Sequence, residues 1–181
     1  MEEYLFKTHL KKDGNHTFTN STTIVHPEYD WWCGTPDGFD ENSVWDIKAP
    51  YTRESFGTLV KYNYPELMKK HKMGAKYKWQ LVSNIILLEA VTGVQFDCGK
   101  LIVYMPYLSE LEDVRKFAEL YQGEFNVYWV SDRNDNRLPH ILDGGKFKNI
   151  NFKEIAVTQE DKNRLTERVI EAGKLLIERN A

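Results

Sequence analysis

The sequence contains few cysteines and no long apolar run, and these two absences argue against several classes of protein. Cys33 and Cys98 are the only cysteines in 181 residues, and their spacing matches neither a disulfide framework nor a zinc site. No apolar run approaches the roughly 18 to 20 residues that cross a bilayer, and the stretch "MEEYLFKTHLKK" lacks the apolar segment of a secretion signal. We therefore expect a cytoplasmic protein with no membrane partner.

Positive charge is also scarce over the chain as a whole. The formal net charge is −3, which argues against a protein that coats nucleic acid through bulk positive charge. A local basic strip is nevertheless present, because residues 69–78, "KKHKMGAKYK", contain five lysines and one histidine and are followed by Trp79. This strip fits a solvated loop with the first turn of a helix, and it equally fits a nucleic-acid contact.

The composition predicts one globular domain over residues 1–181, because 41% of the residues are hydrophobic and 13% are aromatic. A short helix is expected in the first dozen residues, followed by two antiparallel strands, residues 29–39 and 43–50, joined as a hairpin. Residues 51–75 are expected to be irregular or partly helical, with breaks at Gly57, Pro65 and Gly74.

The second half of the chain alternates between helices and strands. Helices are predicted over residues 76–92, over residues 109–123 with a capping pattern from Ser109 to Glu112, and from Thr158 onward with Leu165, Val169, Ala172 and Leu176 on one face. Strands are predicted over residues 100–108, 124–130 and, at a sheet edge, 146–157. This order indicates the α/β (α+β) class, with a central mixed β-sheet flanked by helices.

Charged residues on the two strands of the hairpin predict a metal-binding site. In a strand alternate side chains share a face, so Asp46 and Lys48 point one way while Trp45 and Ile47 point toward an apolar core. Asp37 precedes Asp46 across the hairpin turn, so the two carboxylates are expected to converge beside one ammonium group. Convergent carboxylates need a shared proton or a cation, and oxygen ligands favour Mg²⁺, for which Mn²⁺ substitutes.

Two plainer interpretations of these residues remain open. Asp37 lies in a Pro-Asp-Gly sequence, where aspartate is a common turn residue. Asp46 and Lys48 are also compatible with an ordinary pairing set on an exposed strand face. An EF-hand is excluded because residues 37–46 lack the required glycine and closing glutamate, and the five histidines show no zinc spacing.

The helix at residues 76–92 is apolar around most of its circumference, so its polar residues are informative. Lys76, Gln80 and Asn84 recur every four residues with Ser83 beside them, and we expect this polar stripe to face water or a ligand.

The sequences "TPDG", "WDIK" and "YKWQ" resemble motifs of the PD-(D/E)XK nucleases, within them the lambda-exonuclease-like, YqaJ-type viral recombinases related to the RecB nuclease domain. The resemblance implies a restriction-endonuclease-like core. It also implies that Asp37, Asp46 and the main-chain carbonyl of Ile47 bind the metal, that Lys48 is catalytic, and that Tyr77 and Gln80 line the site. The family usually carries one more acid on a preceding helix, which here is either Glu2 or Glu3 on a chain that is short or truncated at its N-terminus.

The sequence therefore predicts a magnesium-dependent deoxyribonuclease, an exonuclease of phage-type recombination or repair in a bacterium or a phage-infected host cell. The expected catalytic residues are Asp37, Asp46, Lys48 and Gln80, and the expected DNA contacts are Arg53, Lys76, Tyr77, Lys78, Gln80 and Asn84. A single-strand annealing protein and a second copy of the chain are further expected partners. The alternatives are an inactive nucleic-acid-binding module on the same fold and a PD-(D/E)XK endonuclease.

Overall fold

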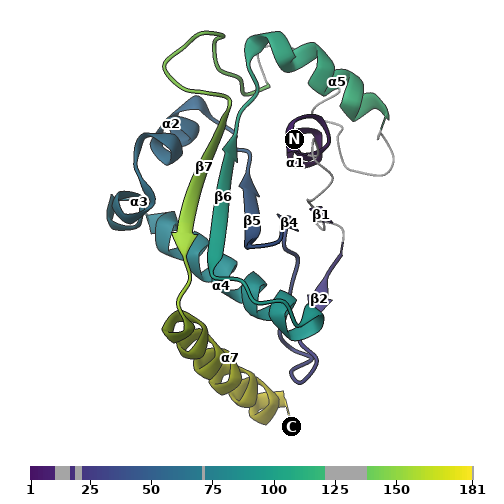
Figure 1. Cartoon of the computed structure of the whole chain (residues 1–181), viewed down its shortest axis with the longest axis vertical. Helices are drawn as coiled ribbons and strands as arrows, with labels where there is room; N and C mark the ends of the chain where they lie inside the picture. The colour runs from purple at the N-terminus through teal and green to yellow at the C-terminus, as the bar shows by residue number, and fades with distance from the viewer. Residues whose placement is uncertain (11–16, 19–21, 71, 121–137, 181) are drawn as a thin grey trace. The chain divides into compact units, whose positions relative to one another are not determined.

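The structure is a computed structural model that describes residues 1–10, 17–18, 22–70, 72–120 and 138–180 (Figure 1). The helices are α1 (Glu2–Leu5), which continues as a π-helix over Phe6–Leu10, α2 (Arg53–Lys61), α3 (Tyr64–Lys70), α4 (Lys72–Thr92), a 3₁₀ turn (Leu108–Glu110), α5 (Leu111–Leu120) and α7 (Gln159–Asn180). The strands are β1 (Thr17–Phe18), β2 (Ile24–Val25), β3 (Cys33–Gly34), β4 (Gly38–Phe39), β5 (Ser43–Lys48), β6 (Cys98–Tyr104) and β7 (Ile150–Ala156).

Five strands form one mixed sheet in the order β1-β4-β5-β6-β7, and β2 and β3 pair separately as a two-stranded ribbon. The predicted α/β class, with a mixed sheet and flanking helices, is confirmed, and it is consistent with a restriction-endonuclease-like core. The predicted edge strand near the C-terminus is also confirmed, since β7 ends the strand order. The strand predicted over residues 124–130 lies outside the described residues.

The chain forms two compact units and passes between them along its length. The first unit consists of Met1–Gly14, Ile47–Asn63 and Ile102–Phe152, and the second consists of Asn15–Asp46, Tyr64–Leu101 and Lys153–Ala181. Strands β5, β6 and β7 each contribute residues to both units. That residues 1–181 act as one domain stays a prediction.

Aromatic residues build the core of the first unit. The Tyr4 ring stacks on Tyr104 with centroids 6.3 Å apart and meets the Phe117 ring edge-on at 5.5 Å. Phe56 of α2 meets Phe147 edge-on at 6.2 Å. Each fully buried large apolar side chain contributes about 1.5 to 3 kcal/mol, so these contacts hold the N-terminal helix and α2 in the unit.

Helix α4 organises the second unit, as its apolar circumference predicts. Its side chains Leu81, Val82, Ile85, Leu87 and Leu88 are buried, and the helix contacts α3, α7 and the β2–β3 ribbon (Figure 1). It ends at Gly93, whose φ of 74° suits a residue without a side chain and whose N–H donates to the Glu89 carbonyl at 2.9 Å.

Residues 51–75 contain α2 and α3, so the partly helical alternative of the prediction is confirmed, whereas the breaks predicted at Gly57 and Pro65 are wrong because both residues lie inside a helix. Helix α2 begins after Thr52, whose hydroxyl accepts from the Ser55 N–H, and Pro65 lies in the first turn of α3, where proline is tolerated. Gly74 is not a break either. A Cβ atom there would lie 2.7 Å from the Met68 Cα atom, so glycine allows α3 and α4 to approach closely.

Two further local predictions have mixed outcomes. Ser109 does not cap α5 with Glu112, since its hydroxyl donates to the Asp143 carboxylate, while the Tyr107 N–H donates to Glu110 at 2.6 Å. Thr158 caps α7 as predicted, because its hydroxyl accepts from the Asp161 N–H at 3.1 Å. The apolar face of α7 is only partly covered, and Leu176 is 58% exposed. None of the described helices is long and apolar enough to span a membrane.

Candidate active site

The β4–β5 hairpin determines where the two predicted aspartates lie. The strands are antiparallel, with Phe39 opposite Val44 and Gly38 opposite Trp45. Asp37 directly precedes Gly38 and lies just outside β4; continued by one position, this register would set Asp37 opposite Asp46. Directly opposed side chains of an antiparallel pair lie on the same face of the sheet, with Cβ atoms about 5 Å apart. The register is therefore compatible with the predicted convergence of the two carboxylates, which stays a prediction.

Strand β5 is buried on both faces, which the sequence pattern does not predict. Ser43 and Trp45 lie on one face and Val44 and Asp46 on the other, and all four are buried, with Asp46 only 1% exposed. The plainer interpretation of Asp46 as part of an exposed pairing set is thereby excluded. A strand at an inner position of a sheet is covered on both sides, so its polar residues are buried together with its apolar ones.

Two ionised carboxylates at opposed positions of this hairpin would repel each other. Two like unit charges about 5 Å apart repel by about 3 kcal/mol at an effective dielectric constant near 20. Burial of Asp46 adds a desolvation penalty that water cannot relieve. A bound cation removes both penalties, and two carboxylates with a backbone carbonyl are the oxygen donors that Mg²⁺ and Mn²⁺ prefer. The residues present fit such an ion.

Lys48 is related to Asp46 through the strand itself, because it lies two residues further along β5 and so on the same face. Ile47 and Lys48 belong to the first unit, whereas Asp37 and Asp46 belong to the second. Lys48 is half-buried and Ile47 is fully buried. An isoleucine side chain carries no ligand atom, so the contact predicted for Ile47 would involve its main-chain carbonyl.

The acids predicted upstream belong to α1. The Glu3 carboxylate pairs with the Lys7 ammonium at 2.7 Å, one helical turn later. Within the described ranges of the chain, no three His, Cys, Asp or Glu side chains gather closely enough to hold a metal ion. That either Glu2 or Glu3 completes the metal site stays a prediction.

The polar stripe of α4 becomes more buried from its N-terminal to its C-terminal end. Lys76 is exposed, Tyr77 and Gln80 are half-buried, and Asn84 is only 4% exposed. The expectation that the whole stripe faces water or a ligand is wrong at Asn84, because β3 packs there. A Cβ atom on Gly34 would lie 2.9 Å from the Asn84 Oδ1 atom, so this amide faces the protein.

Lys78, predicted to contact DNA, is engaged within the second unit. Its ammonium donates to Asp161 of α7 at 2.7 Å. Burial alone would raise the pKa of Asp161, but the Lys78 hydrogen bond and the Thr158 backbone N–H together lower it. Asp161 therefore holds its charge and keeps Lys78 on α7.

Tyr64 of α3 is near enough to Asp46 and to Asp161 for both charges to act on its phenol, and no local pattern indicates this position. Burial raises the pKa of the Tyr64 phenol, and the negative charges of Asp46 and Asp161 raise it further. Its hydroxyl donates to the Gly74 carbonyl at 2.6 Å. The phenol therefore stays protonated between two acids of the second unit.

A third aspartate of the hairpin, Asp40, has a structural role. Its carboxylate accepts from the Ser43 N–H at 2.8 Å and the Ser43 hydroxyl at 2.7 Å, and it pairs with the Lys100 ammonium at 2.9 Å. Burial would raise the pKa of Asp40, but these groups and the Asn42 N–H hold it well below the usual range. Asp40 thus closes the turn between β4 and β5.

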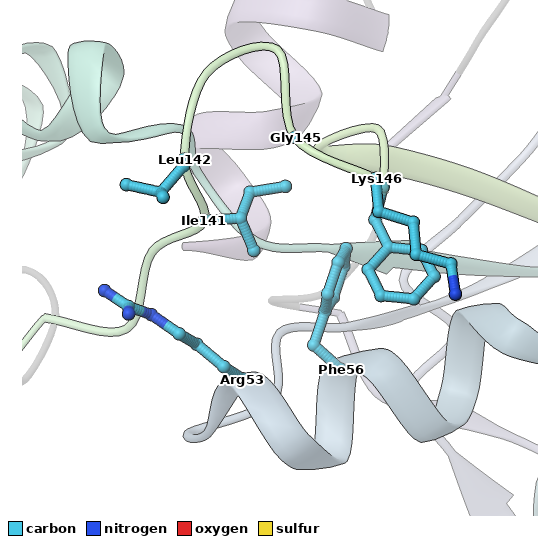
Figure 2. A pocket seen from close by; sticks show the side chains of 7 residues that line it. Arg53, Phe56, Ile141, Leu142, Gly145 and Lys146 are labelled. Carbon is cyan, nitrogen blue, oxygen red and sulfur yellow. The ribbon is translucent and has the colours of Figure 1, made fainter.

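Arg53, the remaining predicted DNA contact, borders a separate pocket in the first unit (Figure 2). The pocket has a volume of about 280 Å³, and Phe56, Ile141, Leu142 and Lys146 contribute to its lining. Figure 2 shows Arg53 and Phe56 extending from α2 toward the loop that carries the other residues.

His140 holds the Arg53 side chain in place. The guanidinium donates through Nε to the His140 carbonyl at 2.6 Å and approaches the His140 Nε2 atom with Nη2 at 2.7 Å. The His140 Nδ1 atom lies 2.9 Å from the Leu138 carbonyl, which assigns Nδ1 as the protonated nitrogen and Nε2 as the acceptor. Nothing in the spacing of the histidines indicates this pairing, since 87 residues separate the two partners.

No protein-family model matches the chain, and no curated protein matches it. Among solved structures, the chain is similar to an alkaline exonuclease (LHK-Exo) from Laribacter hongkongensis, with 13% sequence identity and a TM-score of 0.37. The similarity covers 98% of this chain and 66% of that one, so this chain spans less than two thirds of the length of the exonuclease. A similarity this low assigns no activity to this chain.

Proposed function

We propose that the chain is a metal-dependent deoxyribonuclease of the lambda-exonuclease-like, YqaJ-type family that removes nucleotides from DNA ends during phage-type recombination or repair. The observation that supports this best is the hairpin register, which continued by one position would set Asp37 opposite the buried Asp46. Two ionised acids at one opposed position would repel each other, which disfavours a purely structural role. A divalent ion on a phosphodiester substrate does explain them.

Each residue has a distinct part in the proposed reaction. Asp37, Asp46 and the Ile47 carbonyl would hold Mg²⁺ or Mn²⁺, which would lower the pKa of a water and neutralise phosphate charge. Lys48 orients the attacking water and offsets the charge that develops on the phosphate oxygens. The water gives up one proton to solvent as its oxygen forms a bond to phosphorus, the bond to the leaving sugar oxygen breaks, and that oxygen takes up a proton from solvent.

DNA is held by residues outside the acid pair. Lys76 is exposed on α4 and is available for a backbone phosphate, while Tyr77 and Gln80 line the site from the same helix. Arg53 contributes a guanidinium that His140 has already oriented, which lowers the entropy lost on binding a phosphate. A single-strand annealing protein and a second copy of the chain are the partners that we propose for this activity.

Digestion of labelled DNA tests the proposal. We expect linear duplexes to be shortened from their ends with Mg²⁺ or Mn²⁺ and left intact with a chelator, and covalently closed circles to stay intact. Nicking of circles would indicate an endonuclease instead. Intact linear and circular DNA with either metal, under conditions where the protein binds DNA, would indicate a nucleic-acid-binding module and contradict the proposed reaction.

A further inference from the structure

A small cationic pocket lies between α4 and α7 in the second unit, apart from the proposed acid pair. It is lined by Trp79 of α4 and by Arg164, Leu165 and Arg168 of α7, and its volume is about 210 Å³. Pockets that enclose a whole small molecule usually have about 300 to 1,000 Å³. This pocket therefore has room for one ring or one phosphate of an extended chain.

The charges in this pocket favour an anionic occupant. Arg164 lies over the Trp79 ring at 5.5 Å from its centroid, and the Lys78 ammonium lies 5.6 Å from the same ring. Asp161, one turn before Arg164, is already paired with Lys78 at 2.7 Å. Among the described residues no acid comes within 4 Å of Arg164 or Arg168, although Glu160, Glu167 and Glu171 share their helix.

The spacing of the cations suits a polymer. Arg164 and Arg168 are four residues apart on α7 and so project from one face, while Lys76 and Trp79 are three residues apart on α4. An aromatic ring that accepts any base, flanked by cations that follow a sugar-phosphate backbone, is how proteins hold single strands without sequence preference. Duplex DNA offers phosphates but no unstacked base for the ring.

We propose that the α4–α7 pocket binds single-stranded DNA, with a base against Trp79 and the neighbouring phosphates on Arg164 and Arg168. This inference goes beyond the proposed cleavage reaction and does not require it. The pocket gives the chain a place for one strand after the duplex has been opened, whichever protein opens it.

Binding of fluorescein-labelled oligothymidine to the full chain in a chelator, followed by anisotropy across a salt series, tests the pocket without cleavage. We expect Arg164→Ala/Arg168→Ala to weaken binding and to flatten the salt slope by roughly 1.4, since each phosphate contact to a single strand contributes roughly 0.7. Arg179→Ala, in the last turn of the same helix, is the matched control and should leave both quantities near the parent values.

Trp79 supplies an independent test of the stacking contact. We expect Trp79→Ala to weaken oligothymidine binding roughly 5- to 100-fold and Trp79→Phe to restore most of the affinity, because stacking needs a ring rather than an indole. Thermal unfolding of each variant shows whether it is folded, and Trp79→Phe remains informative if Trp79→Ala does not fold.

Three results would overturn the inference. They are an affinity and salt slope of the double arginine variant equal to those of the parent, equal competition by an acidic peptide of the same charge, and equal competition by a duplex of the same length. The cleavage proposal is tested separately. A parent chain that binds oligothymidine through these residues but cuts no DNA would support the single-strand site and contradict the proposed nuclease activity.

Discussion

Asp40 and Asp46 lie six residues apart on one hairpin and have opposite surroundings. Asp40 accepts hydrogen bonds from Ser43 and pairs with Lys100, so its negative charge is matched by donors from its own unit. Asp46 is 1% exposed, and the register continued by one position would set a second acid, Asp37, opposite it. The comparison distinguishes an acid with defined structural partners from an acid that we propose binds a metal ion.

The same contrast explains why these two acids are expected to respond differently to neutralisation. Removing a matched charge leaves donors unsatisfied, whereas removing one of two repelling charges relieves strain. Residues that act in chemistry are commonly placed at some expense of stability. Stability and activity together therefore distinguish the two roles better than either quantity does by itself.

The largest expected effect is on cleavage. Asp46→Asn should reduce single-turnover cleavage by about 1000-fold or more, because it removes an anionic ligand of the ion on which the reaction depends. Asp40→Asn should retain most of the activity at a temperature where it is folded. Single-turnover digestion of a labelled linear duplex at saturating protein measures both, and equal losses for the two variants would remove the proposed distinction.

The second largest expected effect distinguishes the proposed role of Lys48 from that of the metal-binding acids. Lys48→Ala should bind Mn²⁺ and DNA like the parent but cleave roughly 100- to 1000-fold more slowly, the usual loss for one electrostatic partner of a transition state. Lys148→Ala, a change of the same kind at an exposed lysine, serves as the control. A Lys48→Ala variant that cleaves at the parent rate would contradict its catalytic role.

Stability should change in opposite directions in the metal-free protein. Asp40→Asn should lower the free energy of unfolding by about 1 to 3 kcal/mol, because the Lys100 ammonium and the turn donors lose their charged acceptor. Asp37→Asn should raise it, because the repulsion with Asp46 disappears. Urea unfolding in a chelator measures the free energy of unfolding of both variants, and Glu41→Gln serves as an exposed control. A loss of stability in Asp37→Asn would count against convergence of Asp37 and Asp46.

The smallest effect is a pH dependence that belongs to Asp40. Its pKa is lowered in the folded state, so its contribution is complete above the ordinary carboxyl pKa near 4 and is lost as the pH falls below that value. The parent should therefore lose more stability than Asp40→Asn between about pH 4 and pH 2. Parallel unfolding curves for the two proteins over this range would show that Asp40 carries no such contribution.

Local sequence patterns predict α4, the cap at Thr158, the edge strand and the second strand of the hairpin, because each depends on neighbouring residues. The first strand predicted over residues 29–39 is wrong in its extent, since only Gly38–Phe39 pairs with β5 while Cys33–Gly34 pairs with β2 in a separate sheet. The patterns could not predict that Asp46 is buried, since that depends on strands β4 and β6 on either side of β5. They predict a helix break at Gly74, although this glycine lets two helices approach. Such contacts depend on residues brought together by the fold and leave no periodic signal.

Long-range partners limited the prediction of the site in the same way. The acids and Lys48 are predicted from their spacing along one hairpin, and that they form one site stays a prediction. The partners Asp161 of Lys78 and His140 of Arg53 lie 83 and 87 residues away, so no local motif indicates them. Arg164 and Arg168 do leave a local signal, because two arginines four residues apart share one face of a helix.

The central claim is that Asp37 and Asp46 converge to hold a divalent ion. Calorimetric titration with Mn²⁺ tests this claim most directly. The account predicts that the parent and Asp40→Asn bind the ion with similar affinity and that Asp46→Asn loses tight binding, because a neutral amide replaces an anionic ligand. Thermal unfolding in a chelator confirms that each variant is folded before the titration. Binding of Mn²⁺ by Asp46→Asn as tight as that of the parent would contradict the account.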